Sequence, residues 1–439
     1  MCVRWMLVGS AGIVIPAEAE KGALPPLNPR GEPAGTCVRL RLADGSGLRQ
    51  QATEATNEDA MGKRPDGGGM TRREFLRTAA AGALAAAGSR AVARTGAEEK
   101  ASAMASDMPA QSKLPRWRGF NLLEMFTTQS DGEWQENDFR WMADWGFDFV
   151  RLPLCYTLWI EGNDAWKLHE PGLEKVDRAV DLGRKHHLHV CLNFHRGPGY
   201  SVNEERKEPY NLWKDEAALE AFVFHWTTFA ERYKGIPPEE LSFNLINEPA
   251  GPVAEMTRGD HERVVRTTTA AIRKIDADRL IIADGVQWAT EPCPELTDLG
   301  VAQSCRAYAP SRVSHYKAEW AGPEAMKWPE PVWPGVEEWG KTWDREALEE
   351  FYRPWAELAR QGVGVHCGEG GAYDKTPHTV VLAWLRDVME ILKSHNIGYA
   401  VWNFRGSFGI LDSERENVEY EEFHGHKLDR KMLELLRGF

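Results

Sequence analysis

Two glutamates, Glu248 and Glu369, each follow a short apolar run and precede residues typical of tight turns. Glu248 stands in FNLINEPAG and Glu369 in VHCGEGGAY, and 369 − 248 places them 121 positions apart. Two facing carboxyl groups can cleave a glycosidic bond when one protonates the leaving oxygen and the other attacks the anomeric carbon or activates water. The first question is therefore whether the chain brings these two side chains together.

Other polar and aromatic residues stand at or near the ends of further apolar runs. A cation such as Arg151 and a phenol such as Tyr308 favour the ionised form of a neighbouring carboxylate. An amide such as Asn247 suits a sugar 2-hydroxyl, and Trp402 offers a flat face for a sugar ring. Each residue alone also fits a turn, an ion pair or a core position, so only the set is informative. The set consists of Arg151, His195, Asn247, Arg306, Tyr308 and Trp402.

Eight apolar runs with helical patterns between most of them predict the elements that position these residues. Continuous apolar runs are typical of parallel strands buried on both faces, and eight such units predict an α/β fold, a (β/α)₈ TIM barrel. A doubly wound open sheet fits less well, because no glycine-rich turn follows the first run. Catalytic residues of such barrels gather where strands end, and three units separate the two glutamates. The runs are 117–122, 147–154, 187–194, 240–247, 279–285, 301–308, 362–368 and 398–404.

The N-terminal part differs in composition from the rest. MTRREFLRTAAAGALAAAGSRAVA, residues 70–93, resembles a twin-arginine export signal, although a short Ala-rich helix of the domain is an alternative. We expect 1–69 to be a non-native or disordered extension, 94–112 a linker, and 113–439 the single catalytic domain. The protein would then be periplasmic or extracellular, without stable membrane insertion, because the apolar run is too short and too small-sided to span a bilayer stably.

Charge and cysteine usage exclude several other functions. The net charge of −13 argues against nucleic acid as a partner. The seven Cys show no close-spaced zinc pattern, and no phosphate loop or Ser nucleophile elbow is present. We therefore predict no metal and no cofactor. Four Cys in strand-like runs are expected to be buried free thiols, namely Cys155, Cys191, Cys305 and Cys367.

From about Trp117 to the C-terminus the chain resembles glycoside hydrolase family 5, cellulase-like (β/α)₈ barrels that retain anomeric configuration. The resemblance is carried by RGFNL at 118–122, NEP at 247–249, YAP at 308–310 with SHYKAEW at 314–320, and GEGGAY at 368–373. It implies that Glu248 is the general acid/base and Glu369 the nucleophile. The implied substrate-binding residues are Arg151, His195, Asn247, Arg306, Tyr308, His315, Trp288 and Trp402.

Arg306 departs from the family pattern, which has His two residues before the strand-six Tyr. Arginine carries a fixed charge and accepts no hydrogen bond. Three consequences are open: an altered sugar site, a subsite for an anionic group, or a damaged catalyst. The presence of both glutamates favours altered specificity, with His315 as a candidate replacement for the missing imidazole.

A Trp-rich segment, 321–344, separates the sixth and seventh strand patterns. Its Trp328, Trp333, Trp339 and Trp343 suit stacking subsites for a glycan, and packing of the loop onto the barrel is an equal alternative, as it is for Trp288.

The predicted function is that of an exported retaining hydrolase of β-linked glucan-type polysaccharide or oligosaccharide, with carbohydrate as its partner. A transglycosylating barrel, a catalytically weak glycan-binding barrel, and β-mannanase or exo-glucosidase specificity are the alternatives. A metal-dependent barrel hydrolase is disfavoured. It would need His and Asp pairs at strand ends where this chain has Asn121, Glu248 and Trp402.

Overall fold

The computed structural model describes residues 114–202, 208–252 and 255–439. The extension, signal and linker expected in 1–69, 70–93 and 94–112 lie outside the described residues, so those expectations stay predictions.

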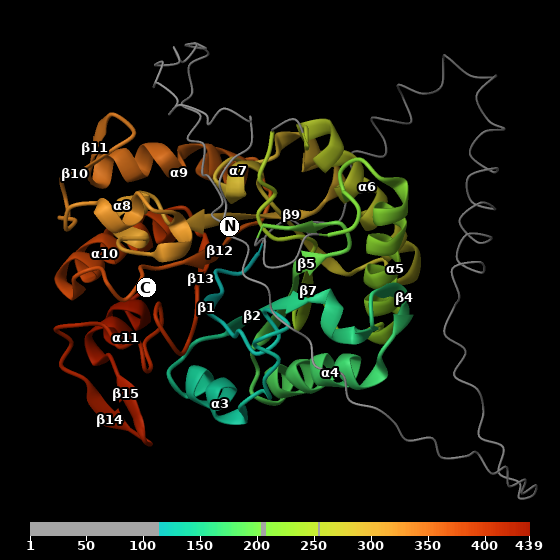
Figure 1. The fold of residues 1–439 in the computed structure, drawn as a ribbon, viewed down its shortest axis with the longest axis horizontal. Coiled ribbons are helices and arrows are strands. Elements are labelled where there is room, and N and C mark those ends of the chain that lie inside the picture. Colours follow the sequence, from blue (N-terminus) through green and yellow to red (C-terminus); the bar gives the residue numbers. More distant parts are fainter. Residues whose placement is uncertain (1–113, 203–207, 253–254) are drawn as a thin grey trace, which may run out of the picture. The chain divides into compact units, whose positions relative to one another are not determined.

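Parallel strands close into a barrel, which confirms the predicted (β/α)₈ fold (Figure 1). Each barrel strand pairs with the next barrel strand along the chain. The first, β1, pairs with both β2 and the last, β13, which closes the ring. Every predicted apolar run overlaps one strand. The strands are β1 (Arg118–Asn121), β2 (Phe149–Cys155), β5 (His189–Gly197), β7 (Leu241–Asn244), β8 (Leu280–Asp284), β9 (Ala302–Ala307), β12 (Val365–Gly370) and β13 (Gly398–Val401).

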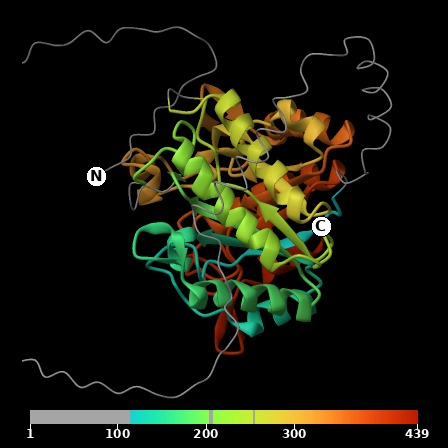
Figure 2. The ribbon, with the colours of Figure 1, turned by 90° about the vertical axis from the view of Figure 1, so that its right-hand side faces the viewer.

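Helices surround the strands, as Figures 1 and 2 show from two directions. In α5 an apolar stripe that includes Phe222 and Trp226 is buried. Thr257 and Asp260 form a capping box that starts α6. No helix in the described ranges has both the length and the apolar character needed to cross a bilayer. The long helices are α3 (Glu136–Asp144), α4 (Glu170–Lys185), α5 (Glu216–Arg232), α6 (Arg258–Ile275), α9 (Arg345–Arg360), α10 (His378–Ser394) and α11 (Arg430–Arg437).

The loops between these strands and helices contain further short helices and strands. Short helical turns are η1 (Tyr156–Trp159), α7 (Val286–Ala289), η2 (Pro294–Leu299), α8 (Ser311–Ser314), η3 (Glu319–Ala321) and η4 (Ala325–Lys327). Short strands are β3 (Ile160–Glu161), β4 (Asp164–Leu168), β6 (Tyr200–Ser201), β10 (Val336–Glu338), β11 (Lys341–Trp343), β14 (Glu421–Phe423) and β15 (His426–Leu428).

Stacked rings fill the barrel interior near the beginnings of its strands. The rings of Trp117 and His189 stack with centroids 3.7 Å apart, and Phe149 stacks against both. Because this part of the interior is packed, substrate chemistry is confined to the opposite end of the barrel, where the strands finish. The Cys of the described ranges are free and buried, which confirms the prediction for the four in strands; they are Cys155, Cys191, Cys293, Cys305 and Cys367.

Candidate active site

One guanidinium contacts both glutamates at the C-terminal mouth of the barrel. Arg306 Nε donates to Glu248 Oε1 at 2.8 Å, and Arg306 Nη2 lies 3.3 Å from Glu369 Oε1. Because a single guanidinium reaches both, the carboxylates lie close together. This arrangement is compatible with the separation of about 5 to 5.5 Å that retaining glycosidases use.

Glu248 is held by its backbone as well as by its side chain. The strand β7 ends at Asn244, three residues earlier than the predicted run, so Glu248 lies in the following loop. It has a left-handed φ of 49°, which is uncommon for a residue with a side chain and recurs at functional sites. Its amide donates to Asp284 Oδ2 at 2.9 Å, and its carbonyl accepts from the Tyr200 hydroxyl at 2.6 Å.

The surroundings of Glu248 keep its carboxyl protonated at neutral pH. Burial and the nearby Glu369 carboxylate raise the pKa of Glu248 to about 8, although Arg306 acts in the opposite direction. A carboxyl that retains its proton near pH 7 is suited to donate it to a leaving oxygen.

Glu369, on β12, is paired with a cation and a phenol. Arg151 Nη1 donates to Glu369 Oε1 at 2.6 Å, and the Tyr308 hydroxyl donates to Oε2 at 3.2 Å. Arg151 is the third residue of β2 rather than its last, and its buried guanidinium reaches the carboxylate of Glu369 on β12. Asn121 and Asn244 also accept hydrogen bonds from its guanidinium and fix its direction. Both contacts orient the Glu369 carboxyl group toward the mouth of the barrel, as a nucleophile requires.

Asn247 is oriented by both guanidiniums. Its Oδ1 accepts from Arg151 Nη2 at 2.9 Å and from Arg306 Nη2 at 2.8 Å. The Asn247 Nδ2 group is therefore left to donate hydrogen bonds to other groups. This nitrogen lies 3.4 Å from His195 Nε2. Burial, Arg151 and Arg306 hold the pKa of His195 well below its usual range, so its ring is neutral.

The three remaining predicted residues contact different parts of the site. Trp402 follows β13 and packs against His195, with ring centroids 5.5 Å apart. The Trp288 amide donates to the carbonyl of Pro249, the residue after Glu248. His315 packs behind Tyr308, with centroids 5.1 Å apart, and burial lowers its pKa to about 4. The position beside Glu248 is occupied by Arg306, so His315 does not replace the family imidazole there.

Asp284, the last residue of β8, is a site residue that the sequence analysis missed. Its side chain is fully buried and contacts Arg306 Nη2, Asn244 Nδ2 and the Glu248 amide. Burial opposes its ionisation, but Arg306 and Arg151 outweigh burial and hold its pKa below the usual value. Its position was visible in the sequence as a polar residue at the end of an apolar run, but its buried charge was not.

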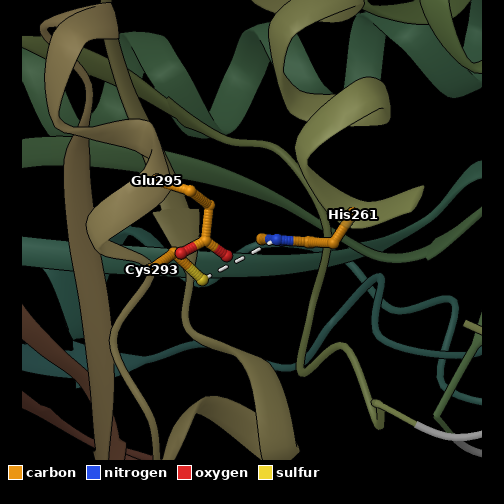
Figure 3. Close-up of side chains that lie close together, drawn as sticks. All are labelled: His261, Cys293 and Glu295. Carbon is orange, nitrogen blue, oxygen red and sulfur yellow. Dashed lines mark hydrogen bonds between the residues drawn. The ribbon is translucent and has the colours of Figure 1, made fainter. Parts of the chain in front are cut away.

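A second side-chain cluster lies outside these contacts. His261, Cys293 and Glu295 point toward one another, and Cys293 Sγ lies 3.7 Å from His261 Nδ1 (Figure 3). The sequence spacing did not reveal this cluster, since His261 is on a separate helix. The Glu295 carboxylate is shared with Arg258, whose charge disfavours a cation, and burial raises the pKa of Cys293 to about 12. These features favour a neutral thiol–imidazole contact.

The closed barrel with two carboxylates at its mouth defines a catalytic barrel of the glycoside hydrolase class. A family model, Cellulase (glycosyl hydrolase family 5), matches residues 107–407, and the chain belongs to this family. Its members are retaining O-glycosyl hydrolases, which confirms the predicted enzyme class.

Several known proteins are similar to this chain. Endoglucanase C of Acetivibrio thermocellus is 27% identical over 311 residues, covering 65% of this chain and 88% of the relative. Cellodextrinase A of Ruminococcus flavefaciens is 28% identical over 276 residues, covering 60% and 76%. The crystal structure of a glycoside hydrolase is 38% identical with a TM-score of 0.71, covering 74% of this chain and 99% of that chain.

Proposed function

We propose that this protein is an exported retaining hydrolase that cleaves β-linked glucan chains, with Glu248 as general acid/base and Glu369 as nucleophile. The observation that carries the assignment of roles is the difference between the two carboxyl environments. Glu369 is paired with Arg151 and Tyr308, whereas burial and Glu369 raise the pKa of Glu248 to about 8. Paired carboxyl groups with such opposed environments are the general signature of an acid and a nucleophile.

In the first step the Glu369 carboxylate attacks the anomeric carbon while Glu248 gives its proton to the leaving oxygen. The glycosidic bond breaks, and an ester forms between the sugar and Glu369. Asn247 Nδ2 binds the 2-hydroxyl in this proposal, which is supported by the two guanidinium contacts of its Oδ1. Trp402 supports the sugar ring.

In the second step Glu248, now a carboxylate, takes a proton from water, and the resulting hydroxide equivalent cleaves the ester. The loss of the negative charge on Glu369 during ester formation removes a cause of the raised pKa of Glu248. The pKa therefore falls when Glu248 must act as a base.

Glucan as the substrate class is supported by the names of the similar proteins, an endoglucanase and a cellodextrinase. The test is reducing-sugar release by the full chain from β-glucans, mannans, xylans and aryl β-glycosides. Release from β-1,4-glucan above all others is the expected result. Preference for mannan would replace the substrate class, and binding without any release would make the protein a glycan-binding barrel.

The alkaline side of the pH profile is expected to report Glu248. Only its protonated form serves as the acid, and its pKa is about 8. We expect kcat/KM to fall by half near pH 8 and about tenfold for each further pH unit, because kcat/KM reports the free enzyme. Initial rates on an unactivated oligosaccharide from pH 5 to pH 10 measure this. A flat profile up to pH 10 would contradict the acid role of Glu248.

Two of the four Trp residues in the Trp-rich loop follow the packing alternative of the sequence analysis. Trp343 is buried, and Trp333 donates its indole N–H to Asp387 at 2.9 Å, so both pack the loop onto the barrel. Trp320, just before the predicted segment, is exposed and packs edge-on against Tyr373 with centroids 4.6 Å apart. Its ring lies 6.5 Å from that of His315, which contacts Tyr308. We assign Trp320 to a sugar ring bound beyond the cleavage point.

Replacing Trp320 with Ala is expected to raise KM for long glucan oligosaccharides about tenfold, a cost of about 1.4 kcal/mol in binding. Activity on a short aryl glycoside should stay unchanged, because that substrate does not extend so far. Trp339→Ala is the matched control, since Trp339 is 52% exposed against 53% for Trp320 but packs on Trp343 instead. Equal effects of the two substitutions would remove the assignment.

Export rests on the predicted signal at 70–93, with Arg72 and Arg73 as the paired arginines. We expect Arg72→Lys combined with Arg73→Lys to retain active enzyme inside the cell, because this route recognises the two arginines and exports folded protein. Activity in periplasmic or culture fractions measures the outcome. Unchanged export of the double variant would point to another route.

A further inference from the structure

Arg306 has a protein partner for each of its five N–H donors. Nε donates to Glu248, and Nη2 donates to Asn247 and Asp284. Nη1 donates to Ser304 Oγ at 3.0 Å and to the Cys305 carbonyl at 3.1 Å. The residue is 2% exposed. A guanidinium with this set of partners has no donor to offer to an anionic substrate group, which removes the main reason to call Arg306 a substrate-binding residue.

The glycine of the nucleophile motif makes room for this guanidinium. A Cβ added at Gly368 would lie 2.6 Å from Ser304 Oγ and 3.3 Å from Arg306 Nη1. Ser304 in turn lies on β9, two residues before Arg306, and accepts one of its hydrogen bonds. The neighbouring strand β12 therefore accommodates an arginine at this position.

The charged groups at the C-terminal mouth of the barrel sum to zero when Glu248 is protonated. Two guanidiniums, Arg151 and Arg306, face three carboxyl groups, Glu248, Asp284 and Glu369. When Glu248 carries a proton, two positive charges meet two negative ones. A buried group of charges is stable only when it is paired in this way. Without Arg306 the same groups would carry an excess negative charge, and without Asp284 an excess positive charge.

We propose that Arg306 and Asp284 form a compensating ion pair that positions Glu248 and keeps the catalytic mouth neutral throughout the reaction. The proposal rests on the proposed function and gives Arg306 a positioning role instead of a substrate contact. Arg306 contacts the Glu248 carboxyl at Oε1, and Asp284 accepts from the Glu248 amide. With Oε1 accepting a hydrogen bond, the acidic proton resides on Oε2.

The balance is preserved through the first chemical step. The proton passes from Glu248 to the leaving oxygen, so Glu248 becomes negative. At the same time Glu369 loses its negative charge by forming an ester with the anomeric carbon. Arg151 and Arg306 then face Glu248 and Asp284, again two charges of each sign. The ion pair thus supports a charge transfer between the two glutamates without creating an unpaired buried charge.

Groups facing Glu248 come from several elements and act in different directions. Among the charged groups, Glu369 and Asp284 raise the Glu248 pKa and Arg306 lowers it. The neighbouring phenols have a raised pKa and remain neutral in the range tested. In the part of the chain that the structure describes, the groups are Arg306 on β9, Tyr308 just after it, Asp284 on β8, Glu369 on β12 and Tyr200 on β6.

The test is a double-mutant cycle of Arg306→His, Asp284→Asn and the double variant. For each variant kcat/KM is measured against pH, and the position of the alkaline limb, the fall in kcat/KM above about pH 8, is compared with the wild type. Arg306→His removes a nearby cation, so the alkaline limb should move to higher pH. Asp284→Asn removes a nearby anion, so the limb should move to lower pH. The double variant should return the limb to the wild-type position, with a rate at least tenfold above the product of the single effects.

Arg279→His is the structural control. It removes a guanidinium as buried as that of Arg306 and paired with Asp276 at 2.7 Å; Arg279 precedes the first residue of β8, so it lies at the end of the barrel away from the glutamates. Arg279→His should lower Tm but leave the alkaline limb of the kcat/KM profile at the wild-type pH. If Arg306→His does not fold, the downward shift in Asp284→Asn still decides the matter.

Shifts of the same sign in both single variants, no shift in Asp284→Asn, or strictly additive losses in the double variant would overturn the proposal. These outcomes require an active wild-type enzyme with a measurable alkaline limb. A wild-type protein that releases no sugar from any substrate would instead overturn the proposed function, so the two failures are distinguishable.

Discussion

Glu369→Gln is expected to lower kcat on every substrate by at least about 10⁴-fold, because the amide cannot form the glycosyl ester. Glutamine has nearly the same shape, so the neighbouring Arg151 and Tyr308 keep a partner at this position. Circular dichroism and binding of a glucan oligosaccharide should therefore stay close to the wild type. The loss then reflects chemistry and not folding.

Trapping of the covalent glycosyl ester tests the role of Glu369 directly. A 2-deoxy-2-fluoro aryl β-glycoside should add one sugar mass to the wild-type protein and none to Glu369→Gln. Glu338→Gln is a suitable control, since Glu338 is also buried but accepts from Ser311 outside the catalytic contacts. It should label like the wild type. Labelling of Glu369→Gln, or of another carboxyl in the wild type, would assign the nucleophile elsewhere.

The barrel was predictable because its strands are buried on both faces. Such strands read as continuous apolar runs, and each run lies between helices with their own periodicity. The strand ends were less predictable. The run that contains β7 continues through Ile246, yet the strand ends at Asn244, since the chain turns there to give Glu248 its left-handed φ. Apolar content indicates burial, whereas a strand end depends on backbone hydrogen bonds.

The residue types at the mouth were predictable, but their contacts were not. Asp284 precedes a glycine and resembles a turn residue in sequence, so its buried charge emerges only with Arg306 beside it. Arg306 departs from the family pattern, and its role depends on which acceptors its five donors reach. The sequence left stacking and packing equally open for the Trp residues within 321–344; Trp333 and Trp343 pack onto the barrel, whereas the exposed Trp320 lies just before that segment. Side-chain direction decided each of these cases.

Glu248→Ala is expected to lower kcat/KM on unactivated glucan oligosaccharides by about 10²- to 10⁴-fold, the usual contribution of general acid catalysis. The loss should be much smaller on a dinitrophenyl β-glycoside, because that leaving group departs without a proton. The alkaline limb near pH 8 should also disappear, since the group with a pKa of about 8 has been removed. Steady-state rates on leaving groups of graded acidity measure both effects.

Removal of Glu248 also removes the base of the second step, so the ester on Glu369 should accumulate when an activated glycoside is used. A burst of phenolate equal to the enzyme concentration, and a protein mass raised by one sugar, are the expected signs. Azide, which needs no base to attack, should restore turnover by releasing a glycosyl azide. Glu369→Gln should show neither burst nor rescue, because no ester can form. An equal loss on all leaving groups would mean that Glu248 holds the substrate or the fold, and the proton donor would have to be sought among the other groups of the mouth.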